Sequence, residues 1–122
     1  MPPTTIHPAD AALPIFDEEV LLTQLAGDRD LARTIIQSAM GDLPGYFDRF
    51  EVAVATGDWK AAEKLSHTMK SLVAQIGGIR LARRLKDVND PLKHGATTDI
   101  ATVTALRAEY EALTDAVTAW MR

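Results

Sequence analysis

The chain of 122 residues contains no cysteine, which excludes disulfide bonds, thiolate catalysis and cysteine-ligated metal sites. It has no uninterrupted apolar run that could cross a bilayer. Its first eight residues, MPPTTIHP, contain no basic segment followed by an apolar one, which a secretory signal would require. We therefore expect a cytoplasmic protein with no membrane partner.

Basic residues are too few for a nucleic-acid-binding surface. The 13 lysines and arginines face 17 aspartates and glutamates, giving a net charge of −4, whereas non-specific nucleic-acid binding needs a basic stripe. The chain also lacks the glycine-rich phosphate-binding loop, the dinucleotide-binding glycine motif and the serine elbow of self-contained enzymes. We therefore expect neither a nucleic-acid partner nor an enzyme with its own catalytic centre.

Histidine is also scarce. His7, His67 and His94 are dispersed along the chain, and none is one helical turn from another, which is the spacing of paired metal ligands on a helix. The sequence therefore predicts no metal site and no bound cofactor. His7 falls in a proline-rich lead-in and His94 in a turn, and we interpret both as bystanders.

Helical periodicity is abundant. Hydrophobic residues make up 47% of the chain, and they recur every three or four positions without strand-like alternation. The expected helices span residues 17–26, 29–56, 59–76, 81–92 and 100–120. This pattern predicts an all-α fold, an antiparallel four-helix bundle with a short extra N-terminal helix. The bundle would occupy residues 15–122 as one domain, after an irregular lead-in at residues 1–14.

Proline and glycine mark the expected breaks between these helices. Pro44 has no backbone N–H to donate, so we expect the second helix to kink or split there, with Asp42 capping a second piece. Gly57-Asp58 predicts a turn followed by a cap. The pair Gly77-Gly78 should close the next helix, because consecutive glycines permit a left-handed residue and a tight reversal.

His67 lies on the solvated face of the helix predicted at 59–76. At about 100° per residue, polar and apolar neighbours fall on opposite sides of this helix. The residues around His67 are Lys60, Glu63, Lys64, Lys70, Ser71 and Ala74. The residues on the far side are Ala62, Leu65, Met69, Leu72, Val73 and Ile76. We therefore expect the imidazole to point outward, with Lys70 one turn away.

This arrangement suits phosphoryl chemistry. An exposed imidazole is largely neutral near pH 7, and its neutral ring nitrogen is a competent nucleophile toward phosphorus. Lys70 could hold a phosphoryl oxygen during the transfer, and Lys64 adds to the same positive field. The small residues Ser71 and Ala74 would let a partner protein approach the ring.

Arginines follow the turn after this helix. Arg80, Arg83 and Arg84 form a basic cluster that could meet an acidic rim on a partner. Their simpler interpretation, which applies to Lys64 as well, is surface charge paired with neighbours one turn away.

The segment from Ala62 to Gly77, AEKLSHTMKSLVAQIG, resembles the signature of histidine-containing phosphotransfer (HPt) domains, whose core has the form A-H-T-L-K-G. The wider layout is similar as well. Phe16-Asp17 opens a short acidic helix, Leu43-Pro44 interrupts a leucine-rich helix, and Gly57-Asp58-Trp59 precedes the histidine helix. The likeness covers roughly residues 15 to 121.

The resemblance implies that His67 is a phosphoacceptor in two-component signal transduction. It would take a phosphoryl group from an aspartate of a response-regulator receiver domain and pass it to another receiver, and a hybrid histidine kinase could supply one of them. Lys70 would stabilise charge beside the phosphohistidine. The resemblance also implies that no ATP is bound and that Mg²⁺ is supplied by the receiver only. We expect a monomer.

The residues expected to face the partner are Lys64, Ser71, Ala74, Gln75 and Gly78. Two of them depart from the family pattern. Ser71 stands where the family usually has glycine, and its hydroxymethyl group is expected to narrow partner choice or slow transfer. Gln75 is not the commonest residue at its position.

Other interpretations stay open at this point. In the simplest, His67 is an ordinary surface histidine and Lys70 a solvated helix lysine. A helical adaptor that docks receivers or kinases without carrying phosphate would have the same fold, and Ser71 is compatible with that role. The heptad-like series from Ile100 to Trp120 could instead form a dimer interface.

Overall fold

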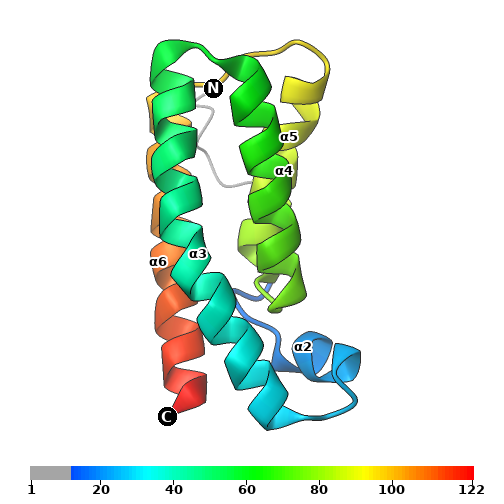
Figure 1. Ribbon diagram of the computed structural model, residues 1–122. Helices are drawn as coiled ribbons and strands as arrows, with labels where there is room; N and C mark the ends of the chain where they lie inside the picture. Colours follow the sequence, from blue (N-terminus) through cyan, green and yellow to red (C-terminus); the bar gives the residue numbers. More distant parts are fainter. Residues whose placement is uncertain (1–11) are drawn as a thin grey trace.

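The computed structural model describes residues 12–122, and this part of the chain is all-helical. Its helices are α2 (Glu18–Gln24), α3 (Arg29–Thr56), α4 (Trp59–Gln75), α5 (Ile79–Lys93) and α6 (Ile100–Met121), as shown in Figure 1. The predicted all-α class is confirmed. None of the described helices combines the length and the apolar composition needed to cross a membrane. His7 and most of the predicted lead-in lie outside the described residues.

The four longer helices lie side by side. In Figure 1, α3 and α5 run in one direction and α4 and α6 in the other. Helix α4 packs against α3 and α5, and α6 packs against the same two helices. The short helix α2 contacts α3. Fully buried side chains from all four longer helices meet between them, among them Ile36, Phe47, Phe50, Met69, Leu85 and Leu113.

Aspartate side chains begin most of the helices. Asp17, Asp28, Asp58 and Asp99 each accept a backbone amide in the first turn of α2, α3, α4 and α6 respectively. Such caps satisfy amides that have no partner within the helix. At the other ends, Gly57 after α3 and Gly77 after α4 adopt left-handed backbone angles, with φ of 73° and 80°. The predicted turns are therefore confirmed.

Helix α3 differs from the prediction at Pro44. It is one continuous helix with Pro44 inside it, so the expectation of a split, with Asp42 as a cap, is wrong. Pro44 removes the hydrogen bond that the Met40 carbonyl would accept, and its ring crowds the same carbonyl. Leu43 and Phe47, on either side of the proline, are both fully buried, and this common apolar stripe favours continuation. Figure 1 shows a change of direction near the middle of α3.

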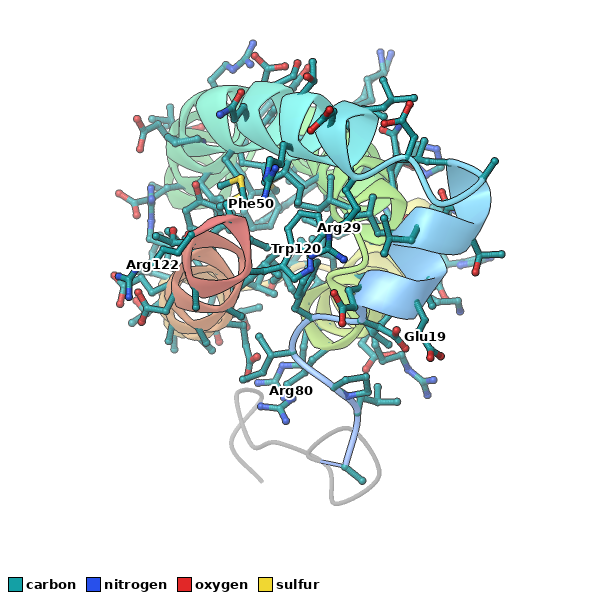
Figure 2. The ribbon with its side chains drawn as sticks, turned by 90° about the horizontal axis from the view of Figure 1, so that it is seen from below. Glu19, Arg29, Phe50, Arg80, Trp120 and Arg122 are labelled. Carbon is teal, nitrogen blue, oxygen red and sulfur yellow. The ribbon has the colours of Figure 1, made fainter. Side chains whose placement is uncertain are left out.

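The segment before α2 is attached to the turn between α4 and α5. The Asp17 amide donates to the Gly77 carbonyl at 2.8 Å, and the Arg80 amide donates to the Pro14 carbonyl at 3.1 Å. The Arg80 guanidinium also donates to the Leu13 carbonyl, from Nε at 3.1 Å and from Nη2 at 2.9 Å. Figure 2 shows Arg80 beside this segment. The end of α4 is thereby fixed against the N-terminal part of the fold.

Trp120, near the C-terminal end of α6, contacts α2, α3 and the segment before α2. Its Nε1 donates to Glu18 at the start of α2, and the Arg29 guanidinium at the start of α3 lies 4.8 Å from the Trp120 ring centroid. Phe16 packs edge-on at 5.8 Å between ring centroids. Figure 2 shows Arg29 and Trp120 close together in the view along the helices.

The apolar series of α6 faces inward. Val103, Leu106, Leu113 and Val117 are all at most 2% exposed within the single chain, so the residues considered for a dimer interface pack against the protein's own helices. Ile100, at the start of the series, is 45% exposed.

Candidate functional site

His67 is exposed near the middle of α4, eight residues after Trp59 and eight before Gln75. The face of α4 opposite His67 packs into the core, where Ala62, Met69 and Val73 are fully buried. This packing fixes the orientation of the helix. Those three residues belong to the apolar side that the sequence pattern predicted. The ring therefore stands on a rigid, well-anchored helix and is accessible from solvent.

Most of the predicted partner-facing residues share this exposed face. Lys64, Ser71, Ala74 and Gln75 are all exposed, as is Lys60. The Ser71 hydroxyl donates to the His67 carbonyl at 3.2 Å. The hydroxyl that distinguishes this residue from glycine is thus hydrogen-bonded to its own helix backbone.

Lys70 lies on the side of α4 that faces α5. It is half-buried, and its charge helps to lower the pKa of Asp90 on α5. The main cause of that lowered pKa is a hydrogen bond from Lys86 at 2.6 Å, with the charges of Lys86, Lys93 and Lys70 adding to it. Lys70 thus lies one turn from His67 and near Asp90 of α5.

The prediction that Gly78 faces a docking partner is wrong. This residue is buried, and an added Cβ would lie 2.6 Å from Val73 Cγ1 and 2.8 Å from Leu113 Cδ2. Gly78 therefore lets α4, α5 and α6 approach closely and does not face a partner.

The arginine cluster after the turn is engaged within the protein. Arg80 binds the Leu13 carbonyl, Arg83 pairs with Asp87 at 3.3 Å, and Arg84 is only 9% exposed. The interpretation of Arg83 as a surface charge paired one turn away is confirmed. A joint basic surface for an acidic partner does not form, because the three side chains serve different contacts.

Two buried polar residues on the inner side of α4 and α5 were not predicted from the sequence. Ser66 and Asn89 are both fully buried, and Asn89 Nδ2 on α5 donates to Ser66 Oγ at 2.9 Å and to the Glu63 carbonyl at 2.8 Å. A signal was available. Asn89 follows Leu85 by four positions and so lies on the apolar stripe of its helix, where a polar residue needs a partner.

A shallow groove of about 380 Å³ lies between α3 and α4. Its lining includes Val52, Ala53, Ala61 and Leu65. Val52 is 62% exposed. Ala61 and Leu65 precede His67 by six and two positions, so at about 100° per residue they point away from the His67 face, and the groove is not part of that face.

The described residues contain no group of three or more histidine, aspartate or glutamate side chains placed to hold a metal ion. His94 lies at the end of α5, where its Nδ1 is 2.9 Å from the Asp90 carbonyl. The chain matches no protein-family model, no curated protein and no solved structure. The likeness to histidine-containing phosphotransfer domains therefore stays a prediction from the residues quoted above.

Proposed function

We propose that this protein is a cytoplasmic phosphorelay intermediate that accepts a phosphoryl group on His67 from a receiver aspartate and passes it to a second receiver. Its four longer helices would form the antiparallel bundle typical of histidine-containing phosphotransfer domains. The observation that carries the proposal is the exposure of His67 on a helix whose other side is firmly buried. A macromolecular phosphodonor can reach only a ring that stands clear of its own protein.

The reaction needs few groups from this chain. A neutral ring nitrogen of His67 attacks the phosphorus of the aspartyl phosphate in line, forming the N–P bond as the bond from phosphorus to the aspartate oxygen breaks. The aspartate carboxylate leaves with the electron pair, and the second ring nitrogen keeps its proton during the attack. Transfer to the next receiver reverses these steps. Catalysis by positioning and charge stabilisation suits such chemistry, and the receiver supplies Mg²⁺.

The surroundings of His67 support the same role. Lys70 lies one helical turn from His67, where its charge would neutralise part of the phosphoryl charge, and the exposed Ser71 and Ala74 are small. Because the Ser71 hydroxyl bonds to its own backbone, it projects less toward a visitor than a free hydroxyl would.

Phosphotransfer from labelled receivers tests the proposal. Wild-type protein should gain an acid-labile label from a phosphorylated receiver, and His67→Gln should gain none while its helical circular dichroism is unchanged. Equal labelling of the two proteins would refute the assignment of His67. A helical adaptor would bind the receiver and acquire no label, so the same experiment separates the two classes of function.

A further inference from the structure

The side chain of Asn89 reaches from α5 into the backbone of the turn that carries His67. Asn89 is fully buried, and its Nδ2 donates to the Glu63 carbonyl at 2.8 Å and to Ser66 Oγ at 2.9 Å. Ser66 Oγ in turn donates to the same Glu63 carbonyl at 3.0 Å. Two side chains from different helices therefore converge on one backbone oxygen.

That oxygen belongs to the hydrogen-bonded turn of His67 itself. In an α-helix the carbonyl of one residue accepts the amide of the residue four positions later, so the Glu63 carbonyl is the helical acceptor for the His67 amide. A serine that bonds back to its own helix tends to bend that helix. The amide of Asn89 reaches the same carbonyl from α5, beside the Ser66 hydroxyl, and so fixes the direction of the turn.

This arrangement is not the one that packing alone would favour. Asn89 Oδ1 is buried without a hydrogen-bond partner, which is a cost that an apolar side chain of similar size would avoid. Leu81 and Leu85 occupy the neighbouring buried positions of α5. A polar group in such surroundings specifies one particular alignment of two helices more sharply than leucine does.

We propose that Asn89 is a positioning residue, which sets the rotation of α4 so that the His67 ring nitrogen faces an incoming phosphoryl group in line. The inference rests on the function proposed above and adds a residue that neither touches phosphate nor lies on the exposed face. Asn89 acts through the Glu63 carbonyl and Ser66, and its effect falls on the transfer step rather than on receiver binding.

The test compares Asn89→Leu with wild type in transfer from a phosphorylated receiver, at several receiver concentrations. The variant should lower the maximal transfer rate roughly tenfold, because small misplacements of reacting groups are costly, while KM for the receiver stays within about twofold. In Asn89→Asp the new side chain has nearly the same shape, but its carboxylate can donate neither hydrogen bond. Transfer in this variant should be slowed as much as in Asn89→Leu. Ser66→Ala removes the serine hydroxyl but keeps the hydrogen bond from Asn89 to the Glu63 carbonyl, so the transfer rate should fall less than in Asn89→Leu.

Thr102→Val is the matched control. Thr102 is a buried polar residue whose hydroxyl donates to Asp99 at the start of α6, so the variant perturbs a buried polar contact away from α4. It should leave the transfer rate within about twofold of wild type.

Hydrogen exchange of the His67 amide gives a second readout that does not depend on phosphate. Exchange at this amide should quicken in Asn89→Leu and not in Thr102→Val. A folded Asn89→Leu protein that transfers at the wild-type rate would overturn the positioning role and leave the proposed function intact. A wild-type protein that takes up no label would overturn both.

Discussion

Lys70 and Lys64 each lie one turn from His67, yet their surroundings differ. Lys64 is exposed, whereas Lys70 is half-buried beside α5, where its charge contributes to the lowered pKa of Asp90. A partly desolvated cation interacts more strongly with a phosphoryl group than a fully hydrated one does. This difference gives a physical reason for assigning the charge-stabilising role to Lys70 rather than to Lys64.

We predict that Lys70→Ala slows phosphoryl transfer to His67 by about tenfold or more, because one charge that meets the transferring group is lost. Lys64→Ala should slow it only about twofold, since a screened surface charge contributes little. Rapid-quench kinetics with one phosphorylated receiver would measure both rates. The reverse order of effects would show that Lys64 is the supporting cation.

At the residue scale the sequence predicted the exposed half of the site and missed the buried half. The spacing of His67, Lys64 and Ser71 on one face follows from helical geometry alone. The contacts of Asn89 with Ser66 and of Gly78 with Leu113 could not be predicted, because they depend on how separate helices meet. Gly78 was placed on the docking surface for the same reason.

At the scale of elements, caps and periodicity were sufficient to predict the helices. Asp58 was an expected cap, and it accepts an amide in the first turn of its helix, as Asp28 and Asp99 do in theirs. The end of α2 was placed too late, since that helix stops at Gln24. The sequence left a kink or a split open at Pro44, and α3 is continuous because burial on both sides of the proline outweighs the local preference for a break.

The turn between α4 and α5 gives a prediction at this scale. Gly77 has φ of 80°, and a Cβ there would lie 2.5 Å from the Asp17 carbonyl oxygen. Gly77→Ala should therefore lower the free energy of unfolding by about 1–3 kcal/mol, from strain and from displacement of the N-terminal segment. Urea unfolding followed by circular dichroism measures the change.

Gly95→Ala provides the comparison. Gly95 has a similar φ of 85° but no atom within 4 Å of the added Cβ, so this variant carries the backbone strain without the contact. Equal losses of stability in the two variants would mean that the contact with Asp17 contributes nothing.

At the scale of the whole molecule, the segment before α2 and the end of α6 stabilise the same region of the fold. The N-terminal segment binds the turn after α4, and Trp120 links the end of α6 to α2 and α3. Both sets of contacts join residues far apart in sequence. Helical periodicity identified the participating helices, but it contained no information on which ends would meet.

We predict that Trp120→Ala lowers the free energy of unfolding by roughly 2 kcal/mol, below the cost for a fully buried tryptophan because Trp120 is half-buried. Transfer to His67 should persist in the folded variant, since Trp120 lies away from the exposed face of α4. Thr118→Ala, an exposed change on the same helix, should stay within about 0.5 kcal/mol of wild type. A loss of transfer in folded Trp120→Ala would mean that this end of the molecule belongs to the docking surface.

The central claim concerns one side chain, and locating the phosphoryl group tests it most directly. The protein would be incubated with a phosphorylated receiver and digested at neutral pH, and the modified peptide would be sequenced by mass spectrometry. We predict that the phosphoryl group resides on the imidazole of His67. Recovery of the phosphoryl group on another residue, or its absence from the protein after contact with all receivers of the host, would contradict the proposal.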